Sequence, residues 1–161
     1  MLAARFAPGR RLFDIGIGDG TVVIVAARCG FHVTATDVAP SALGRARRLA
    51  DLAAAPSIVL VLDDITAPRL DASYDIAVDR GLLHSLSRDQ RAAYAAAITT
   101  LVSGGGTLLV VAHAPGVELG TQPLADDDLV ALLPAFALVR TQPTTLAGAP
   151  AQLFELDRRA G

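Results

Sequence analysis

The stretch Asp14-Ile-Gly-Ile-Gly-Asp-Gly20 contains the residues of this chain best suited to bind a polar ligand. It follows the short apolar run 11–13 and precedes the apolar segment 21–27, so we predict a turn from a buried strand into a helix. Glycine at every second position permits a tight turn and a close approach of the backbone to a ligand. The helix adds unpaired N–H groups and the positive end of its dipole. The stretch predicts a site for a polar or charged small molecule, while packing alone is the competing explanation.

The elements that must position this turn alternate along the chain. Apolar or alternating runs predict strands at 11–13, 31–36, 57–62, 74–78 and 107–112. Helices are predicted at 20–29, 40–54 and 87–102, with Ser87 as a cap, and a short one at 126–133. Glycines 104–106 are expected to end the third helix, and two strand-like runs follow at 137–142 and 151–156. The alternation predicts an α/β fold with a parallel sheet and right-handed crossovers.

Polar residues follow each of the first five predicted strands. They are Asp14 to Gly20, Asp37, Asp63 with Asp64, Asp79 with Arg80, and His113. In a parallel sheet the ligand sits beyond the carboxyl ends of the strands, where the strand order reverses. Random placement would scatter these acids over both edges of the sheet. Their common position therefore favours a ligand site over a turn kept for packing.

The glycine spacing helps to separate two classes of nucleotide-binding protein. Nicotinamide and flavin enzymes carry G-x-G-x-x-G, whose third glycine permits close packing near a pyrophosphate. After Gly16 and Gly18 that position is Thr21, and the third glycine comes one residue earlier, at Gly20. Asp37 does not discriminate, because a carboxylate after the second strand can bind a ribose diol in either class.

An acid followed by G-x-G-x-G, as at residues 14–20, resembles the first motif of the class I S-adenosylmethionine-dependent methyltransferases. The likeness covers nearly the whole chain. It includes Asp37, Asp63-Asp64-Ile65, the segment 74–84 and the segment 104–109. The Asp79-Arg80-Gly81 form is similar to that of small-molecule methyltransferases, including thiol and thiopurine types.

The resemblance implies a Rossmann-like three-layer sandwich in one domain, residues 1–161. Its seven-stranded sheet would be mostly parallel and end in an antiparallel hairpin. S-adenosylmethionine would be the cofactor and S-adenosylhomocysteine the product. The turn would surround the methionine part, Asp37 would hold the ribose, Asp63 would accept from the adenine amino group, and the backbone at 79–80 would face the methionine amine. The implied cofactor-binding residues are Asp14, Gly16, Gly18, Gly20, Asp37, Val38, Asp63, Asp64, Ile65, Asp79 and Arg80.

The implied reaction is in-line methyl transfer to a small-molecule thiol, hydroxyl or amine. Positioning alone supplies much of the rate acceleration of such a reaction. A base is needed only where the acceptor must lose a proton. His84 is the candidate base, because imidazole titrates near neutrality; a structural hydrogen bond to the loop is the alternative. His113 is a packing or acceptor-site residue. No metal is expected, since Asp79 and His113 carry no ligand signature.

Composition excludes several other functions. A chain of 161 residues with 52% apolar residues suits one domain with a full core. The net charge of −2 argues against nucleic-acid binding, and we interpret the arginines at 45, 47 and 48 as a solvated helix face. The single cysteine, Cys29, rules out an internal disulfide and fits the cytoplasm. No apolar run approaches the roughly 18 residues that a membrane span needs.

Only residues 1–10 precede the first predicted strand, whereas many family members carry a longer lead-in that caps the acceptor. We therefore expect an open acceptor pocket. Either a second subunit of a homodimer or a partner chain covers it, the substrate is large, or the chain is a trimmed or degenerate domain. The alternative function is a non-catalytic S-adenosylmethionine-binding domain that acts as a sensor or partner subunit. A nicotinamide oxidoreductase is the third hypothesis.

Overall fold

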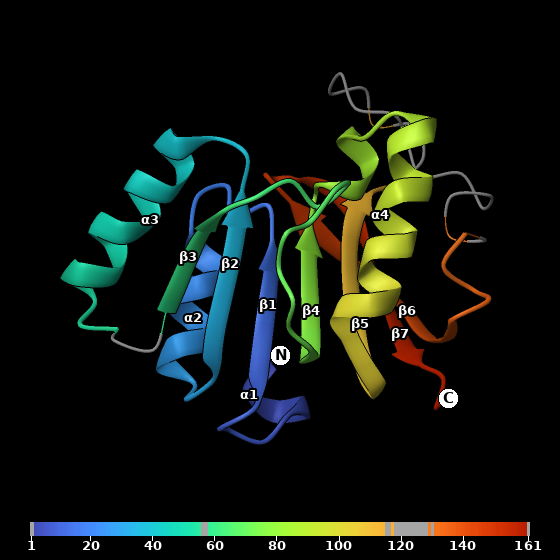
Figure 1. The fold of residues 1–161 in the computed structure, drawn as a ribbon, viewed down its shortest axis with the longest axis horizontal. Helices are drawn as coiled ribbons and strands as arrows, with labels where there is room; N and C mark the ends of the chain where they lie inside the picture. The colour runs from blue at the N-terminus through green and yellow to red at the C-terminus, as the bar shows by residue number, and fades with distance from the viewer. Residues whose placement is uncertain (1, 56–57, 115–116, 118–128, 130, 161) are drawn as a thin grey trace.

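The computed structural model of the chain describes residues 2–55, 58–114, 117, 129 and 131–160 (Figure 1). Its strands are β1 (Arg11–Ile15), β2 (His32–Asp37), β3 (Ile58–Leu62), β4 (Tyr74–Arg80), β5 (Val102–His113), β6 (Phe136–Leu146) and β7 (Ala149–Arg158). Its helices are α1 (Leu2–Arg5), α2 (Thr21–Arg28), α3 (Pro40–Leu52) and α4 (Arg88–Leu101), with a 3₁₀ turn, η1 (Leu83–Ser85).

The strands form one seven-stranded sheet in the order β3-β2-β1-β4-β5-β7-β6. The pairs from β3 to β5 are parallel, and β7 is antiparallel to both β5 and β6. The strand order reverses between the neighbours β1 and β4, so the turn after β1 and the loop after β4 meet at one edge. The mostly parallel sheet with a C-terminal antiparallel hairpin is confirmed.

Helices cover both faces of the sheet, with α4 in front and α2 behind in the view of Figure 1. On the α4 face, Phe13, Tyr94 and Ile98 belong to one buried apolar cluster. On the other face, α2 and α3 join a second cluster, which also contains Phe6 from the segment after α1. These two cores make the predicted three-layer sandwich and hold the strand ends rigidly enough to define a site.

The fifth strand begins earlier than the sequence indicated. Helix α4 ends at Leu101 and β5 begins at the next residue, so glycines 104–106 lie inside a strand. A Cβ at Gly106 would lie 2.9 Å from the Asp75 carbonyl oxygen and from that of Ser103. The pairing of β4 with β5 shifts register between Tyr74 and Ile76. The glycine therefore permits a close backbone approach at this irregularity, and it does not end the helix.

The last strands are also longer than predicted, and β6 runs through Pro143. Proline is tolerated there because β6 is the edge strand of the sheet. Residues 1–10 showed no long periodic pattern, yet they contain the one-turn helix α1. Half of the helix predicted at 126–133 lies outside the described residues, and residues 131–133 form a turn. The cap at Ser87 is confirmed, because its side chain accepts from the Gln90 amide and the Gln90 side chain accepts from the Ser87 amide.

Candidate functional site

The glycine turn adopts backbone conformations that only glycine takes readily. Gly16, Gly18 and Gly20 have φ angles of 72°, 52° and 78°, all in the left-handed region. A Cβ at Gly20 would lie 3.4 Å from Ala46 of α3, so this glycine also serves helix packing. The Ile17 amide donates to the Thr36 carbonyl of β2 at 2.9 Å. The turn is thus held against the end of the second strand.

Asp37 connects the turn to the segment that begins α3. Its Oδ2 accepts from the Gly18 amide at 3.3 Å, and its Oδ1 accepts from the Ala39 amide at 2.8 Å. Val38 beside it is 66% exposed. Each carboxylate oxygen can accept a second hydrogen bond, so Asp37 can bind a diol while it organises the turn.

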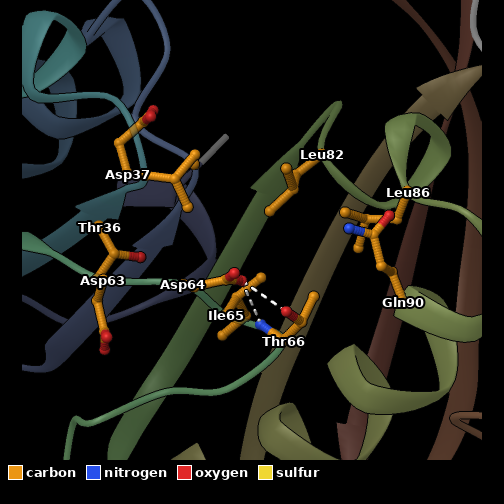
Figure 2. Close-up of a pocket in the computed structure, with 11 residues that line it drawn as sticks. Thr36, Asp37, Asp63, Asp64, Ile65, Thr66, Leu82, Leu86 and Gln90 are labelled. Atoms are coloured by element: carbon orange, nitrogen blue, oxygen red, sulfur yellow. Dashed lines mark hydrogen bonds between the residues drawn. The ribbon is translucent and has the colours of Figure 1, made fainter.

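A cavity of about 190 Å³ opens beyond the ends of β1, β2 and β3, and Figure 2 shows the residues around it. It brings together these predicted site residues: Gly16, Asp37, Val38, Asp63, Asp64 and Ile65. Its other lining residues were not predicted from the sequence; they are Thr36, Thr66, Leu82, Leu86 and Gln90. For Gln90 the sequence contains one indication: Ser87-x-x-Gln90 matches a capping box, which places Gln90 in the first turn of a helix. Leu82 and Leu86 lie in the loop after β4. Apolar residues in a loop do not by themselves indicate a binding site.

The two acids after β3 are engaged differently. Asp63 is buried and accepts from the Arg69 amide at 3.0 Å and from Arg69 Nε at 3.3 Å. Asp64 Oδ1 accepts from the Thr66 hydroxyl at 2.7 Å and from the Thr66 amide at 2.9 Å, and these bonds lower the pKa of Asp64 (Figure 2). Both carboxylates therefore shape the loop that forms one wall of the cavity. Adenine recognition by Asp63 stays a prediction, and it would have to share the carboxylate with Arg69.

Asp14 is a buried carboxylate with an unsatisfied oxygen. Its exposed fraction is 2%, and Oδ2 has no hydrogen-bond partner among the described residues. Burial, followed by the charges of Asp79 and Asp19, raises the pKa of Asp14 well above its usual value. A buried acceptor without a partner is costly, and a bound cation with N–H donors would satisfy it. This end of the site is suited to positive charge.

Asp79 organises the loop after β4. Its carboxylate accepts from the amides of Gly81, Leu82 and Leu83 at 3.0, 2.7 and 3.0 Å. Burial raises the pKa of Asp79 to about 6 against these hydrogen bonds, which lower it. These bonds engage the Asp79 side chain in the loop, and the contact of the backbone at Asp79 and Arg80 with the methionine amine stays a prediction. The Arg80 guanidinium lies 3.6 Å from the Asp19 carboxylate.

His84 of η1 and His113, the last residue of β5, form a buried pair. Their ring centroids are 4.8 Å apart with an interplanar angle of 24°. His84 Nδ1 accepts from the His113 amide at 3.3 Å, so neutral His84 carries its proton on Nε2. Burial, with the nearby His113 and Arg91, lowers the pKa of His84. Neither histidine lines the cavity of about 190 Å³, and the role of His84 as a base stays a prediction.

The described residues hold no group of three or more His, Cys, Asp or Glu side chains that could bind a metal ion. Among the helices of this part of the chain, none combines the length and the apolar character needed to cross a bilayer.

Residues 12–106 match the model of a methyltransferase domain family. Because the match spans more than half of the chain, the chain belongs to this family. The predicted membership of the class I S-adenosylmethionine-dependent methyltransferases is confirmed. The small-molecule type suggested by Asp79-Arg80-Gly81 stays a prediction. A search of the curated proteins gave no match.

Solved methyltransferase structures share the fold at low sequence identity. The N-methyltransferase NodS from Bradyrhizobium japonicum WM9, in complex with S-adenosylhomocysteine, superposes with a TM-score of 0.82 at 19% identity, over 94% of this chain and 79% of that one. Magnesium protoporphyrin IX methyltransferase from Synechocystis PCC 6803, with S-adenosylmethionine bound, gives a TM-score of 0.80 at 22% identity, over 97% of this chain and 73% of that one. The 1,6-didemethyltoxoflavin-N1-methyltransferase of Burkholderia thailandensis gives a TM-score of 0.78 at 21% identity, over 98% of this chain and 75% of that one.

The residues at the strand ends fit S-adenosylmethionine. The unpartnered Asp14 oxygen suits the cationic methionine end of that molecule. Asp37 has acceptor capacity left for a ribose diol, and Gly16 borders the cavity without a side chain. A dinucleotide would instead require a site for a pyrophosphate, and a second negative group beside Asp14 is unfavourable.

Proposed function

We propose that this protein is an S-adenosylmethionine-dependent methyltransferase that acts on a thiol, hydroxyl or amine of a small molecule. One observation carries the proposal. A turn of three left-handed glycines lies next to a buried carboxylate whose Oδ2 has no partner in the described residues. Such a site favours a ligand that is cationic at one end and carries hydroxyls at the other, beside Asp37.

In this proposal each part of the site holds one part of the cofactor. Asp14 faces the positive charge, Asp37 binds the ribose hydroxyls, and the loop 64–66 with Leu82 and Leu86 encloses the adenine in the cavity. The backbone at Asp79 and Arg80 faces the methionine amine. The bound cofactor supplies a methyl group already activated by its attachment to a sulfonium.

The chain's own contribution is then to hold the acceptor in line and to exclude water. A nucleophile about 3 Å from the methyl carbon reacts through positioning, which can supply several kcal/mol of the barrier. A thiolate or free amine needs no base before attack. A hydroxyl has to lose its proton, and for such an acceptor His84 is the predicted base.

Two further features belong to the proposal. The enzyme acts in the cytoplasm, and a second subunit or a partner chain covers the acceptor side. Sedimentation velocity with and without S-adenosylhomocysteine tests the second feature. A monomer under both conditions would rule out the homodimer.

Titration calorimetry with S-adenosylhomocysteine and, separately, NADH tests the cofactor. We expect the adenosyl ligand to bind and NADH to give no heat of binding. Asp37→Ala should weaken the adenosyl ligand by about tenfold or more, because two ribose hydroxyls lose an ionised acceptor. The exposed Asp51→Ala on α3 is the matched control and should bind like the wild type. NADH binding without a response to the adenosyl ligand would refute the proposal.

Catalysis is tested separately from binding. The protein is incubated with S-adenosylmethionine labelled in its methyl group and a panel of thiols, phenols and amines. We expect label to appear in at least one acceptor. Intact cofactor binding with no transfer to any acceptor class would favour the non-catalytic sensor.

A further inference from the structure

A second cavity lies on the α2 face of the sheet and shares no lining residue with the cavity at the ends of β1 to β3. Its volume is about 270 Å³. Side chains from α2 and from four strands line it: Thr21, Val22, Val25, Val78, Arg80, Leu109, Val111, Thr144, Thr145 and Leu153. We call this cavity the apolar groove.

The groove has an apolar floor. Val78 of β4, Leu109 of β5 and Leu153 of β7 are all buried, with exposed fractions of 6%, 4% and 2%. Val25 of α2 forms part of a wall and is 49% exposed. A concave apolar surface with few polar groups is the usual form of a small-molecule site, and the volume of the groove is close to the lower end of the range for such sites.

Arg80 is the one charged residue among the described residues that line the groove. Its pairing with Asp19 is loose, because the closest nitrogen and oxygen atoms are 3.6 Å apart and Asp19 is 63% exposed. A charge-assisted hydrogen bond is usually about 2.7–2.9 Å long. The planar guanidinium therefore keeps donors for an anion, and a carboxylate matches its geometry with two parallel hydrogen bonds.

The charged end of the groove adjoins the place where a methyl acceptor has to be. Arg80 is the last residue of β4, and β4 borders β1 at the reversal of strand order. Thr21, also in the lining, is the first residue of α2 directly after the glycine turn. Next to Arg80, a Cβ at Gly81 would lie 3.1 Å from Leu146 and 3.5 Å from His84. Arg80 at the end of the groove is thus next in the chain to a glycine that lies close to both the hairpin and His84.

We propose that the apolar groove is the acceptor pocket, and that it takes an apolar molecule carrying a carboxylate, which Arg80 binds. This inference rests on the proposed methyl transfer and deepens it by naming the acceptor class. The carboxylate orients the acceptor at the end of β4, and the aliphatic floor binds its apolar body.

The first test uses 2-naphthoate as the probe and 2-naphthamide, which is neutral and of similar shape, as its partner. Both are titrated into the full chain saturated with S-adenosylhomocysteine, and into the chain alone. We expect naphthoate to bind at least about tenfold more tightly than the amide, as a charged hydrogen-bonded pair allows. Arg80→Gln should abolish this preference. Arg28→Gln, an exposed residue of α2 outside the lining, is the charge-matched control and should keep it.

A second variant keeps the test decisive if Arg80→Gln perturbs the fold. Val111→Phe places a larger side chain in the groove and should weaken both probes by about tenfold or more, because it occupies their volume. Its thermal shift with S-adenosylhomocysteine should equal that of the wild type. Equal binding of the two probes by the wild type, or full probe affinity in Val111→Phe, would overturn the proposal.

Proximity to the methyl group decides whether the groove is the acceptor pocket. With S-adenosylmethionine labelled with carbon-13 in its methyl group, we expect nuclear Overhauser contacts between that methyl and the naphthoate ring. Probe binding without such contacts would overturn the acceptor assignment and leave the proposed cofactor site intact. If S-adenosylhomocysteine itself does not bind, the proposed function fails, whereas the titration of the chain alone still reports on the groove.

Discussion

Asp14 on β1 and Asp79 on β4 are buried carboxylates on neighbouring parallel strands, and their surroundings give them different tasks. Asp79 accepts hydrogen bonds from three loop amides, so its carboxylate stabilises the conformation of the loop 81–83. Asp14 keeps an oxygen without a partner among the described residues, and its pKa is raised mainly by burial. A polar group left unsatisfied in a folded core is unfavourable unless a ligand completes it. Asp14 is therefore the residue whose substitution should report on cofactor charge.

We expect Asp14→Asn to weaken S-adenosylmethionine by about tenfold or more, because it removes the carboxylate that faces the positive end of the cofactor. S-adenosylhomocysteine keeps the methionine ammonium group and should be weakened by a similar factor, because that group carries the N–H donors that the Asp14 oxygen can accept from. In the wild type, affinity for S-adenosylmethionine should rise with pH, since the raised pKa keeps Asp14 protonated at low pH and the cation binds its ionised form. The asparagine variant should lose the part of that dependence that Asp14 contributes and keep only the part near pH 6 that comes from Asp79. Calorimetry across pH 5–8 checks this, and an unchanged pH profile in the variant would contradict it.

His84 can be tested with two substitutions that separate a base from a structural acceptor. Asparagine can still accept from the His113 amide but cannot act as a base, whereas phenylalanine keeps a ring and removes the acceptor. If the panel identifies a thiol or amine acceptor, which needs no base, we expect His84→Asn to keep kcat within about tenfold of the wild type. His84→Phe should lower the free energy of unfolding by about 1–3 kcal/mol, because it leaves the His113 amide unpaired. A loss of 10²–10⁴ in kcat for a stable His84→Asn would establish His84 as the base.

At the scale of elements, Gly106 and Gly44 are a matched pair of glycines in regular structure. A Cβ at Gly106 in β5 would lie 2.9 Å from two carbonyl oxygens, whereas one at Gly44 in α3 would lie 3.7 Å from Arg48 Nη1. Gly106→Ala should lower the free energy of unfolding by about 1–3 kcal/mol, since backbone has to move. Gly44→Ala should raise it by about 0.5–1 kcal/mol through helix propensity. Urea unfolding measures both, and a neutral Gly106→Ala would show that the strand relaxes freely.

The order of strands and helices was predictable because each element carries a local pattern. The β-branched run ending at Asp37, the Ser87 cap and the apolar run of β3 each act within a few residues. The start of β5 at Val102 was not predictable, because glycines 104–106 usually indicate a turn. Their place in a strand depends on the approach of Asp75, about 30 residues earlier in the chain.

At the scale of the whole molecule, Glu155 connects the two ends of the chain. This buried carboxylate of β7 accepts from Arg5 Nε of α1 at 2.8 Å and from Arg140 Nη2 of β6 at 3.0 Å. Both arginines are about half exposed, at 45% and 48%, so water screens each pair. The pairing holds the N-terminal helix against the C-terminal hairpin.

We expect Arg5→Ala and Arg140→Ala each to cost less than about 1 kcal/mol of unfolding free energy, because Glu155 keeps one partner. The double variant should lose more unfolding free energy than the two single variants lose together, since it removes both arginine partners of the buried carboxylate. A double-mutant cycle by urea unfolding measures the coupling. Adding Glu155→Gln to the double variant should recover part of the loss, and strictly additive costs would contradict the shared role of Glu155.

The sequence by itself determined the α/β class and the positions of the glycine turn and of the acids at the strand ends, and its motifs resemble those of the family. These features follow from apolar periodicity and from glycine and aspartate spacing, which are local in the chain. Only the tertiary structure decided what each carboxylate does: Asp63 is bonded to Arg69, Asp79 to its loop, and Asp14 keeps an unpartnered oxygen within the described residues. It also decided that His84 stacks on His113 and that Arg80 borders an apolar groove. Burial and pairing of this kind depend on strands brought together from distant parts of the chain, which no local pattern encodes.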